Sequence, residues 1–226
     1  MRTIVIAPLV LGCIAGLSLM AQTAKPVGPS PKPSTPKAQT PAKTTGEPAA
    51  VLQTTAGKIV IKFFPDKAPN HVKNFLALCK SGFYNGTKFH RVIPGFMIQG
   101  GDPNTKTGDP ATWGLGGNVG KDGQEINVKA EFNDVHHARG IVSMARSSDP
   151  NSASSQFFIC VADAGNLDHQ YSAFGQVVEG MDVVDKIVSG PRDTSNDRPK
   201  NPVAIQKAWV EYLPGAEPAA KGAPAK

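Results

Sequence analysis

The sequence lacks the motifs of several common enzyme classes, and each absence excludes a chemistry. It contains no Gly-x-Ser-x-Gly stretch and no His-Glu-x-x-His stretch, so it offers no basis for serine hydrolysis at a nucleophile elbow or for zinc-dependent hydrolysis. The run GLGGNVGKDG at 114–123 lacks the Gly and the Ser or Thr of a Walker A motif, because Leu115 and Asp122 stand at those positions. We expect a flexible loop there and no cofactor.

Histidine and cysteine, which supply most metal ligands and nucleophiles, are scarce, with five and three residues in 226. His136 and His137 are adjacent and would point apart in an extended chain, so we expect a surface loop and no metal site. Cys79 and Cys160 lie in the apolar contexts FLALCK and FFICV, where a thiol behaves as a small hydrophobic side chain. We expect free thiols, although an oxidising compartment would permit a disulfide between them.

Excess positive charge is confined to the ends of the chain. The formal net charge is +6, but acidic and basic residues nearly balance between Val51 and Leu213, so there is no electrostatic case for nucleic-acid binding. Residues 25–48 contain seven prolines and only one large apolar side chain, too little to offset the entropy cost of folding. We expect a disordered Pro/Lys-rich linker at 22–49, one domain at 50–213 and a disordered tail at 214–226.

One long hydrophobic run stands at the N-terminus, where residues 1–21 read MRTIVIAPLVLGCIAGLSLMA. A single Arg, an uncharged apolar stretch and small residues at the end are typical of a signal peptide. We therefore expect an exported protein of the periplasm or cell envelope. An uncleaved anchor is an alternative, because Ile4 to Met20 is 17 residues and a spanning helix needs roughly 17 to 25. Lipid attachment at Cys13 is another, and either would tether the chain to a membrane.

Short alternating strands and two amphipathic helices are predicted for the domain. Residues 51–64 read as a hairpin with Ile and Lys alternating after an Ala-Gly turn. Residues 66–82 read as a helix with Val72, Phe75, Leu76 and Cys79 on one face, and residues 180–190 as a second helix with Met181, Val184 and Val188 on one face. Short strands fill the rest, and 204–213 is the last. This order favours a mainly β fold, a closed antiparallel barrel capped by helices.

Two stretches combine bulky apolar residues with polar ones in an unusual way: FHRVIPGFMIQGGD at 89–102 and GIVSMARSSDPNSASSQFFI at 140–159. They resemble the two signature stretches of the cyclophilins, which are peptidyl-prolyl cis-trans isomerases. The similarity extends from about Val51 to Leu213 and includes VEGMDVVDKI. It implies a cyclophilin-like fold, a closed eight-stranded antiparallel β-barrel capped by two α-helices.

The resemblance also implies a set of site residues. Arg91 matches the catalytic arginine of the family. The residues that match its substrate-binding positions are Phe96, Met97, Gln99, Ala145, Arg146 through its backbone, Gln156, Phe158, Leu167 and Tyr171. The sequence departs from many members at Asn166, where they carry Trp, and at Tyr171, where they carry His. Because that Trp is associated with cyclosporin binding, sensitivity to this inhibitor stays open.

The chemistry of proline isomerisation fits this set. Rotation about an X-Pro amide faces a barrier of about 20 kcal/mol, set by amide resonance, and an enzyme must favour the twisted amide over both planar forms. Apolar walls would hold the proline ring, and the guanidinium of Arg91 would present fixed donors to the prolyl nitrogen and nearby carbonyls. We expect Gln99 to hold the substrate backbone and to steady Arg91. We expect His90, on the opposite face of the strand, to be a hydrogen-bonded core residue.

We therefore predict a peptidyl-prolyl cis-trans isomerase that assists the folding of exported proteins. Its partners would be proline-containing polypeptides, and we expect a monomer. The alternative is a non-catalytic adaptor that binds proline-containing peptides on the same fold.

Overall fold

The computed structural model describes residues 46–214. The expected leader at 1–21, the expected linker up to residue 45 and the expected tail from residue 215 lie outside these residues. The α-helices and strands of the described part are, in chain order, β1 (Glu47–Thr54), β2 (Gly57–Phe63), α1 (Pro69–Lys80), β3 (Arg91–Ile93), β4 (Met97–Gly100), β5 (Ile141–Met144), β6 (Phe157–Cys160), β7 (Ala173–Glu179), α2 (Met181–Val188), β8 (Arg192–Asp193), β9 (Arg198–Pro199) and β10 (Ile205–Leu213).

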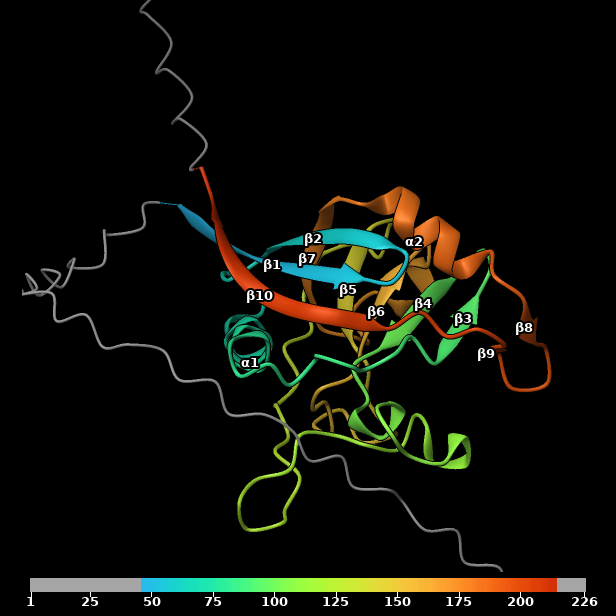
Figure 1. The fold of residues 1–226 in the computed structure, drawn as a ribbon. Coiled ribbons are helices and arrows are strands. Elements are labelled where there is room, and N and C mark those ends of the chain that lie inside the picture. The colour runs from blue at the N-terminus through green and yellow to red at the C-terminus, as the bar shows by residue number, and fades with distance from the viewer. Residues whose placement is uncertain (1–45, 215–226) are drawn as a thin grey trace, which may run out of the picture. The chain divides into compact units, whose positions relative to one another are not determined.

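One antiparallel sheet of eight strands dominates the described chain, in the order β10-β1-β2-β7-β5-β6-β4-β3. Figure 1 shows this sheet curling around an interior, with α1 and α2 on opposite sides of it. The predicted mainly β fold with two α-helices is confirmed. The predicted closed barrel is wrong, because β3 and β10 end the sheet and do not pair with each other.

The sheet stays open because its two edge strands do not run alongside each other. β3 has only three residues, and the N–H of Val92 at its centre donates to the carbonyl of Asp197 at 2.9 Å instead of to β10. Residues 86–89, which precede β3, bridge the gap with hydrogen bonds of 2.7, 2.8 and 3.0 Å to residues 203–205. These few bonds replace the continuous ladder that a closed barrel would need.

The predicted hairpin is present as β1 and β2, but it starts earlier than expected. β1 begins at Glu47, inside the expected linker, and Ala49 is fully buried between Glu211 of β10 and Lys62 of β2. An alanine carries little hydrophobic signal, so sequence composition placed the boundary too late. Ile59 on β2 faces the core and is fully buried, as the alternation with lysine predicts.

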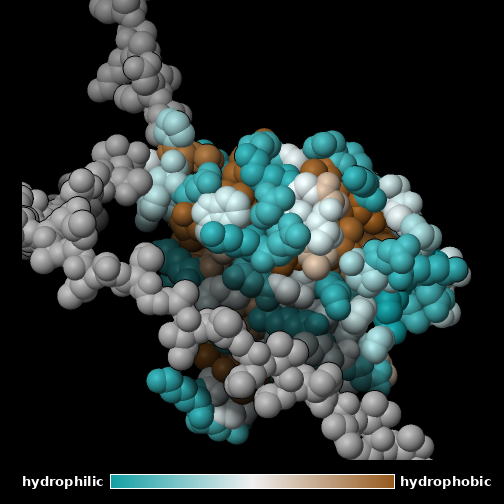
Figure 2. Space-filling model, in the orientation of Figure 1, coloured by the Kyte–Doolittle hydropathy of each residue, from teal (hydrophilic) through white to brown (hydrophobic). Residues whose placement is uncertain are grey.

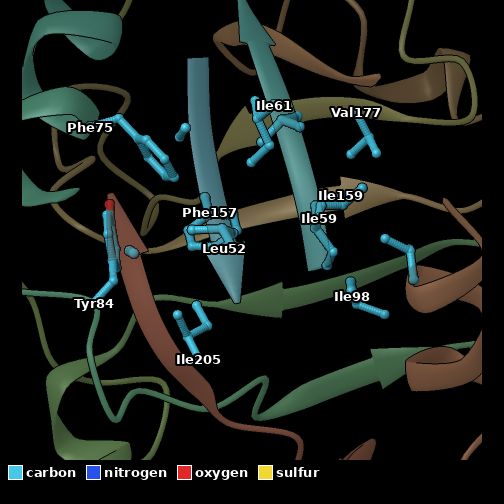
Figure 3. Packing of buried hydrophobic residues seen from close by; sticks show 14 of the residues in the cluster. Leu52, Ile59, Ile61, Phe75, Tyr84, Ile98, Phe157, Ile159, Val177 and Ile205 are labelled. Carbon is cyan, nitrogen blue, oxygen red and sulfur yellow. The ribbon is translucent and has the colours of Figure 1, made fainter. Parts of the chain in front are cut away.

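The core lies inside the curled sheet and is covered by α1 and by the buried face of α2. Figure 3 shows Phe75 of α1 directed toward the strands, close to Leu52, Tyr84 and Phe157. The Phe75 ring is 4.8 Å from that of Tyr84 and 5.2 Å from that of Phe157, centroid to centroid, within the range of favourable aromatic pairs. The predicted helix face is confirmed except at Leu76, which is half-buried while Leu78 is buried in its place.

The N-terminus of α1 is capped from a distant part of the chain. Its own N-cap residue, Ala68, has no side chain that can accept a hydrogen bond. The carboxylate of Glu131 instead accepts the backbone N–H groups of Asn70 and His71 at 3.0 Å and the Nδ1–H of His71 at 2.6 Å. A carboxylate here meets both the unpaired N–H groups and the positive end of the helix dipole.

The surface on the side shown in Figure 2 is largely hydrophilic, and hydrophobic residues reach it in separate small areas. Within residues 46–214, no helix has both the length and the apolar character that crossing a membrane requires.

Candidate active site

The hairpin of β3 and β4 positions the first signature stretch. Pro94 and Gly95 form its turn, closed by a 3.0 Å hydrogen bond from the N–H of Phe96 to the carbonyl of Ile93. Gly95 has φ +74°, which a type II turn with proline before it requires. This turn places Phe96 immediately before Met97, the first residue of β4.

A row of side chains crosses the sheet on the face turned away from the core. Arg91 on β3 pairs with Gln99 on β4, Gln99 with Phe158 on β6, and Phe158 with Ser143 on β5. Directly paired residues in an antiparallel sheet share one face. Met97 and Phe158 belong to an apolar cluster separate from the core. The strands are buried on both faces, so they read as continuous apolar runs although their side chains alternate.

A cavity of about 250 Å³ opens over this row. Its lining contains nearly the whole predicted set: Arg91, Phe96, Met97, Gln99, Ala145, Arg146, Phe158, Leu167 and Tyr171. Gln156 is the exception, because it lines a neighbouring cavity of about 250 Å³ that also includes Gln99, Ala145 and Arg146. Residues from five separate stretches of sequence thus meet at two adjoining cavities.

The guanidinium of Arg91 remains available to the cavity. Its side chain is 43% exposed, and its ion-pair partner is Asp197, with 4.0 Å between Nε and Oδ2. Gln99 is the cross-strand partner of Arg91, but its side-chain amide donates to Gln156 Oε1 at 2.9 Å, and no side-chain hydrogen bond joins Gln99 to Arg91 within residues 46–214. Sequence reasoning missed Asp197, which lies 106 residues away in the chain.

Gln156 acts as a clamp beside the cavity. Its side-chain amide donates to the carbonyls of Gly114 and Gly116 at 2.9 and 2.8 Å, while its oxygen accepts from Gln99. The glycine-rich loop predicted to be flexible is therefore fixed to the sheet at its start.

Tyr171 and Arg146 form the exposed edge of the cavity. The ring of Tyr171 stands edge-on to Phe158, with 5.6 Å between centroids. The guanidinium of Arg146 lies 4.6 Å from the centre of the Tyr171 ring and donates to the carbonyl of Gln170 at 3.1 Å. Arg146 therefore supports the site with its side chain as well as with the backbone that the resemblance pointed to.

The expectation that the adjacent histidines point apart is wrong, because both rings turn toward the same carboxylate, although His136 is 52% exposed at the surface. His136 Nδ1 lies 2.7 Å from Asp168 Oδ2, and His137 Nδ1 lies 2.9 Å from Asp168 Oδ1. His137 is only 1% exposed and stacks on Phe158 with 6.1 Å between ring centroids. The two histidines therefore tie the loop that carries Leu167 to the back of the cavity wall.

The carboxylate of Asp168 is the hydrogen-bond partner that His136 and His137 share. Hydrogen bonds from His136 and then His137 hold the pKa of its carboxyl far below the ordinary value. Hydrogen bonds to Asp168 and Asp163 raise the pKa of His136 in turn. His137 contacts Asp168 through Nδ1 and Ser143 through Nε2, the order of contacts in a hydrolytic triad, but Ser143 is fully buried and cannot reach a substrate.

His90 is buried as predicted, but the predicted hydrogen bonding is wrong. Neither ring nitrogen has a hydrogen-bond partner among residues 46–214. Burial lowers the pKa of His90, so the ring is neutral near pH 7. An uncharged ring in that place is consistent with a packing role.

Other site types find no support in the described part of the chain. No group of three or more His, Cys, Asp or Glu side chains within 46–214 could hold a metal ion. Cys79 and Cys160 are free and buried, as predicted.

The comparisons with known proteins agree with this geometry. Residues 49–210 match the family model described as cyclophilin type peptidyl-prolyl cis-trans isomerase/CLD. A probable peptidyl-prolyl cis-trans isomerase of Brucella abortus is 44% identical over 169 residues, covering 73% of this chain and 83% of the relative. A peptidyl-prolyl cis-trans isomerase of Acinetobacter baylyi is 44% identical over 171 residues, covering 72% and 85%.

A solved structure supports the same conclusion. The cyclophilin-type isomerase of Cryptosporidium parvum, crystallised in the presence of the dipeptide Ala-Pro, is 32% identical with a TM-score of 0.64 and covers 73% of this chain and 99% of its own. The chain belongs to the cyclophilin-type peptidyl-prolyl cis-trans isomerase family. Its function is accordingly catalysis of cis-trans isomerisation at X-Pro peptide bonds.

Proposed function

We propose that Arg91 is the catalytic group and that the cavity above Phe158 binds the proline ring of the substrate. The observation that carries this proposal is an arginine on the rim of the cavity whose guanidinium makes no hydrogen bond within residues 46–214 and lies 4.0 Å from the carboxylate of Asp197. An arginine with a purely structural role would be expected to donate its N–H groups to carboxylates or carbonyls of the fold.

The lining suits the two halves of the substrate. Phe96, Met97, Phe158 and Leu167 present an apolar surface for the pyrrolidine ring and exclude water from it. Gln99 and the backbone near Ala145 offer polar groups at the edge, where the peptide backbone of the substrate would lie. A proline-containing polypeptide therefore fits, and the dipeptide used with the Cryptosporidium parvum structure is consistent with this substrate class.

The mechanism needs no bond to break and no proton to move. As the X-Pro amide twists, the nitrogen lone pair localises, and a donor aimed at that nitrogen stabilises the twisted form more than either planar form. The guanidinium stays charged at every working pH and carries its donors in a rigid fork. When bound substrate displaces water from the cavity, one such donor is worth about 3 to 4 kcal/mol, or about 100- to 1000-fold in rate.

The test is a protease-coupled isomerisation assay on the full chain, comparing wild type with Arg91→Ala and Arg91→Lys. We expect kcat/KM to fall at least about 100-fold for Arg91→Ala, with partial loss for Arg91→Lys because lysine keeps the charge but not the fork. Arg139→Ala is the matched control, because Arg139 pairs with Asp185 on α2 and not with the cavity. A folded Arg91→Ala variant with near wild-type activity would refute the role of Arg91. A folded wild type without activity would favour the adaptor alternative.

We also propose that the enzyme acts on exported proteins in the periplasm or cell envelope. The support is the sequence of residues 1–21, with one Arg before an uncharged apolar run. N-terminal sequencing of the protein from fractionated cells checks it, because export with cleavage gives a chain that starts after Ala21 or Ala24. An intact N-terminus in the cytosolic fraction would contradict export.

A further inference from the structure

The small hairpin of β8 and β9 covers the exposed edge of the strand that carries Arg91. Figure 1 shows β8 and β9 beside β3. The loop between them ends at Asp197, whose carbonyl accepts the N–H of Val92 at 2.9 Å. This bond fixes the backbone of Asp197 to the residue that follows Arg91.

The side chain of Asp197 is directed to two arginines. Its Oδ2 lies 4.0 Å from Nε of Arg91, and its Oδ1 lies 3.3 Å from Nε of Arg192. The backbone of Asp197 is left-handed, with φ +58°, a conformation that aspartate tolerates better than most residues at some cost in energy. The carboxylate of Asp197, 27% exposed, thus lies next to Arg91. Its position is fixed by Arg192 and by the backbone hydrogen bond to β3.

We propose that Asp197 is a positioning residue for Arg91, an inference that rests on the catalytic role proposed above. Asp197 approaches the Nε side of the guanidinium and leaves the terminal nitrogens free for the cavity. A half-exposed arginine would otherwise distribute among many rotamers, because its side chain has a large conformational entropy. The ion pair restricts this choice before substrate arrives, which is how preorganised groups contribute to catalysis.

The carboxylate also has an opposing effect, because its negative charge weakens the positive potential of Arg91 at the substrate. That effect is small here, since both partners are exposed enough for solvent to screen the charge. Solvent does not reduce the effect of orientation in the same way, because a guanidinium of Arg91 in the wrong rotamer contributes nothing to the rate. Removal of the charge at 197 should therefore lower the activity.

The test uses Asp197→Asn in the full chain. Asparagine keeps the size, one acceptor oxygen and the tolerance for a left-handed backbone, so the fold should remain. We expect kcat/KM to fall about three- to fivefold, the upper range for an exposed ion pair. Asp193→Asn is the matched control, because Asp193 lies in the same hairpin and bonds Ser195. It should leave kcat/KM unchanged.

A double-mutant cycle separates positioning from a structural role. In the Arg91→Ala background, Asp197→Asn should have no further effect, because nothing is left to position. In the ¹H–¹⁵N spectrum, the Nε–H signal of Arg91, assigned by its loss in Arg91→Ala, should shift in Asp197→Asn and not in Asp193→Asn.

The outcomes distinguish this inference from the function proposed above. If Arg91→Ala is inactive but Asp197→Asn is as active as wild type, or more active, positioning is refuted and the catalytic role stands. An equal loss of activity from Asp197→Asn with and without Arg91 would also refute it and assign Asp197 to the fold. If Arg91→Ala itself is active, the catalytic role fails and the inference with it.

Discussion

Replacement of Glu131 by glutamine tests how a contact far from any local pattern stabilises the fold. Glu131 caps α1 and binds the buried ring of His71, with 2.6 Å between Oε2 and Nδ1. Its side chain is 13% exposed, so water replaces these contacts poorly. Glutamine keeps one acceptor of similar shape but loses the charge.

The magnitude follows from the kind of bond that is lost. Hydrogen bonds to a charged group contribute about 1.5–3 kcal/mol each and neutral ones about 0.5–1.5, and a lost helix cap alone costs about 0.5–2 kcal/mol. Since these terms overlap, we expect Glu131→Gln to lower the free energy of unfolding by about 1.5–3 kcal/mol at pH 7. Urea denaturation followed by circular dichroism measures this.

The pH dependence gives a second check. Partial burial raises the pKa of the Glu131 carboxyl, but hydrogen bonds from His71 and Asn70 outweigh it and hold the pKa below the ordinary value. A depressed pKa means that the stabilisation is present above the unfolded pKa of about 4.3 and is lost as pH falls through the folded one. The difference in stability between the wild type and Glu131→Gln should therefore shrink as the pH falls below about 4.3.

The control is Glu179→Gln, which removes an exposed ion pair of 2.8 Å with Lys58 and should cost less than about 1 kcal/mol. If Glu131→Gln is as stable as wild type at pH 7, the capping argument fails. A deficit that does not shrink as the pH falls below about 4.3 would show that the loss comes from packing and not from the charge.

Two further predictions concern the site and the thiols. Gln156→Leu removes the bond to Gln99 and releases the loop at Gly114, so kcat/KM should fall several-fold with little loss of stability; an unchanged kcat/KM in the coupled assay would contradict the clamp. Burial raises the pKa of Cys79 and of Cys160 to about 12, so in a Cys13→Ser variant neither should react with Ellman's reagent at pH 8 until the protein is unfolded; rapid labelling of that native variant would show that the two thiols are accessible.

The site could be predicted from sequence to the extent that its residues are close together in two long motifs. Strand alternation turns Phe158 and Met97 to one face, and the Pro94-Gly95 turn puts Phe96 beside them. The relative positions of these side chains therefore follow from the local sequence. All but one of the predicted site residues line a single cavity, and Gln156 lines the next.

The contacts that only the tertiary structure decided join residues distant in the chain. Asp197 meets Arg91, Glu131 meets the start of α1, and Asp168 meets both adjacent histidines. Each partner lies in a loop with no periodic pattern, and a single carboxylate in a loop reads from sequence as a solvated surface residue.

By itself the sequence determined the family, the strand and helix periods and the chemical character of the cavity, because these depend on residues that are neighbours along a strand or turn. The tertiary structure decided that the sheet stays open between β3 and β10 and which charged groups hold Arg91 and α1 in place. The reason is that loop closure brings together groups tens of residues apart, and no local preference of the chain specifies those pairings.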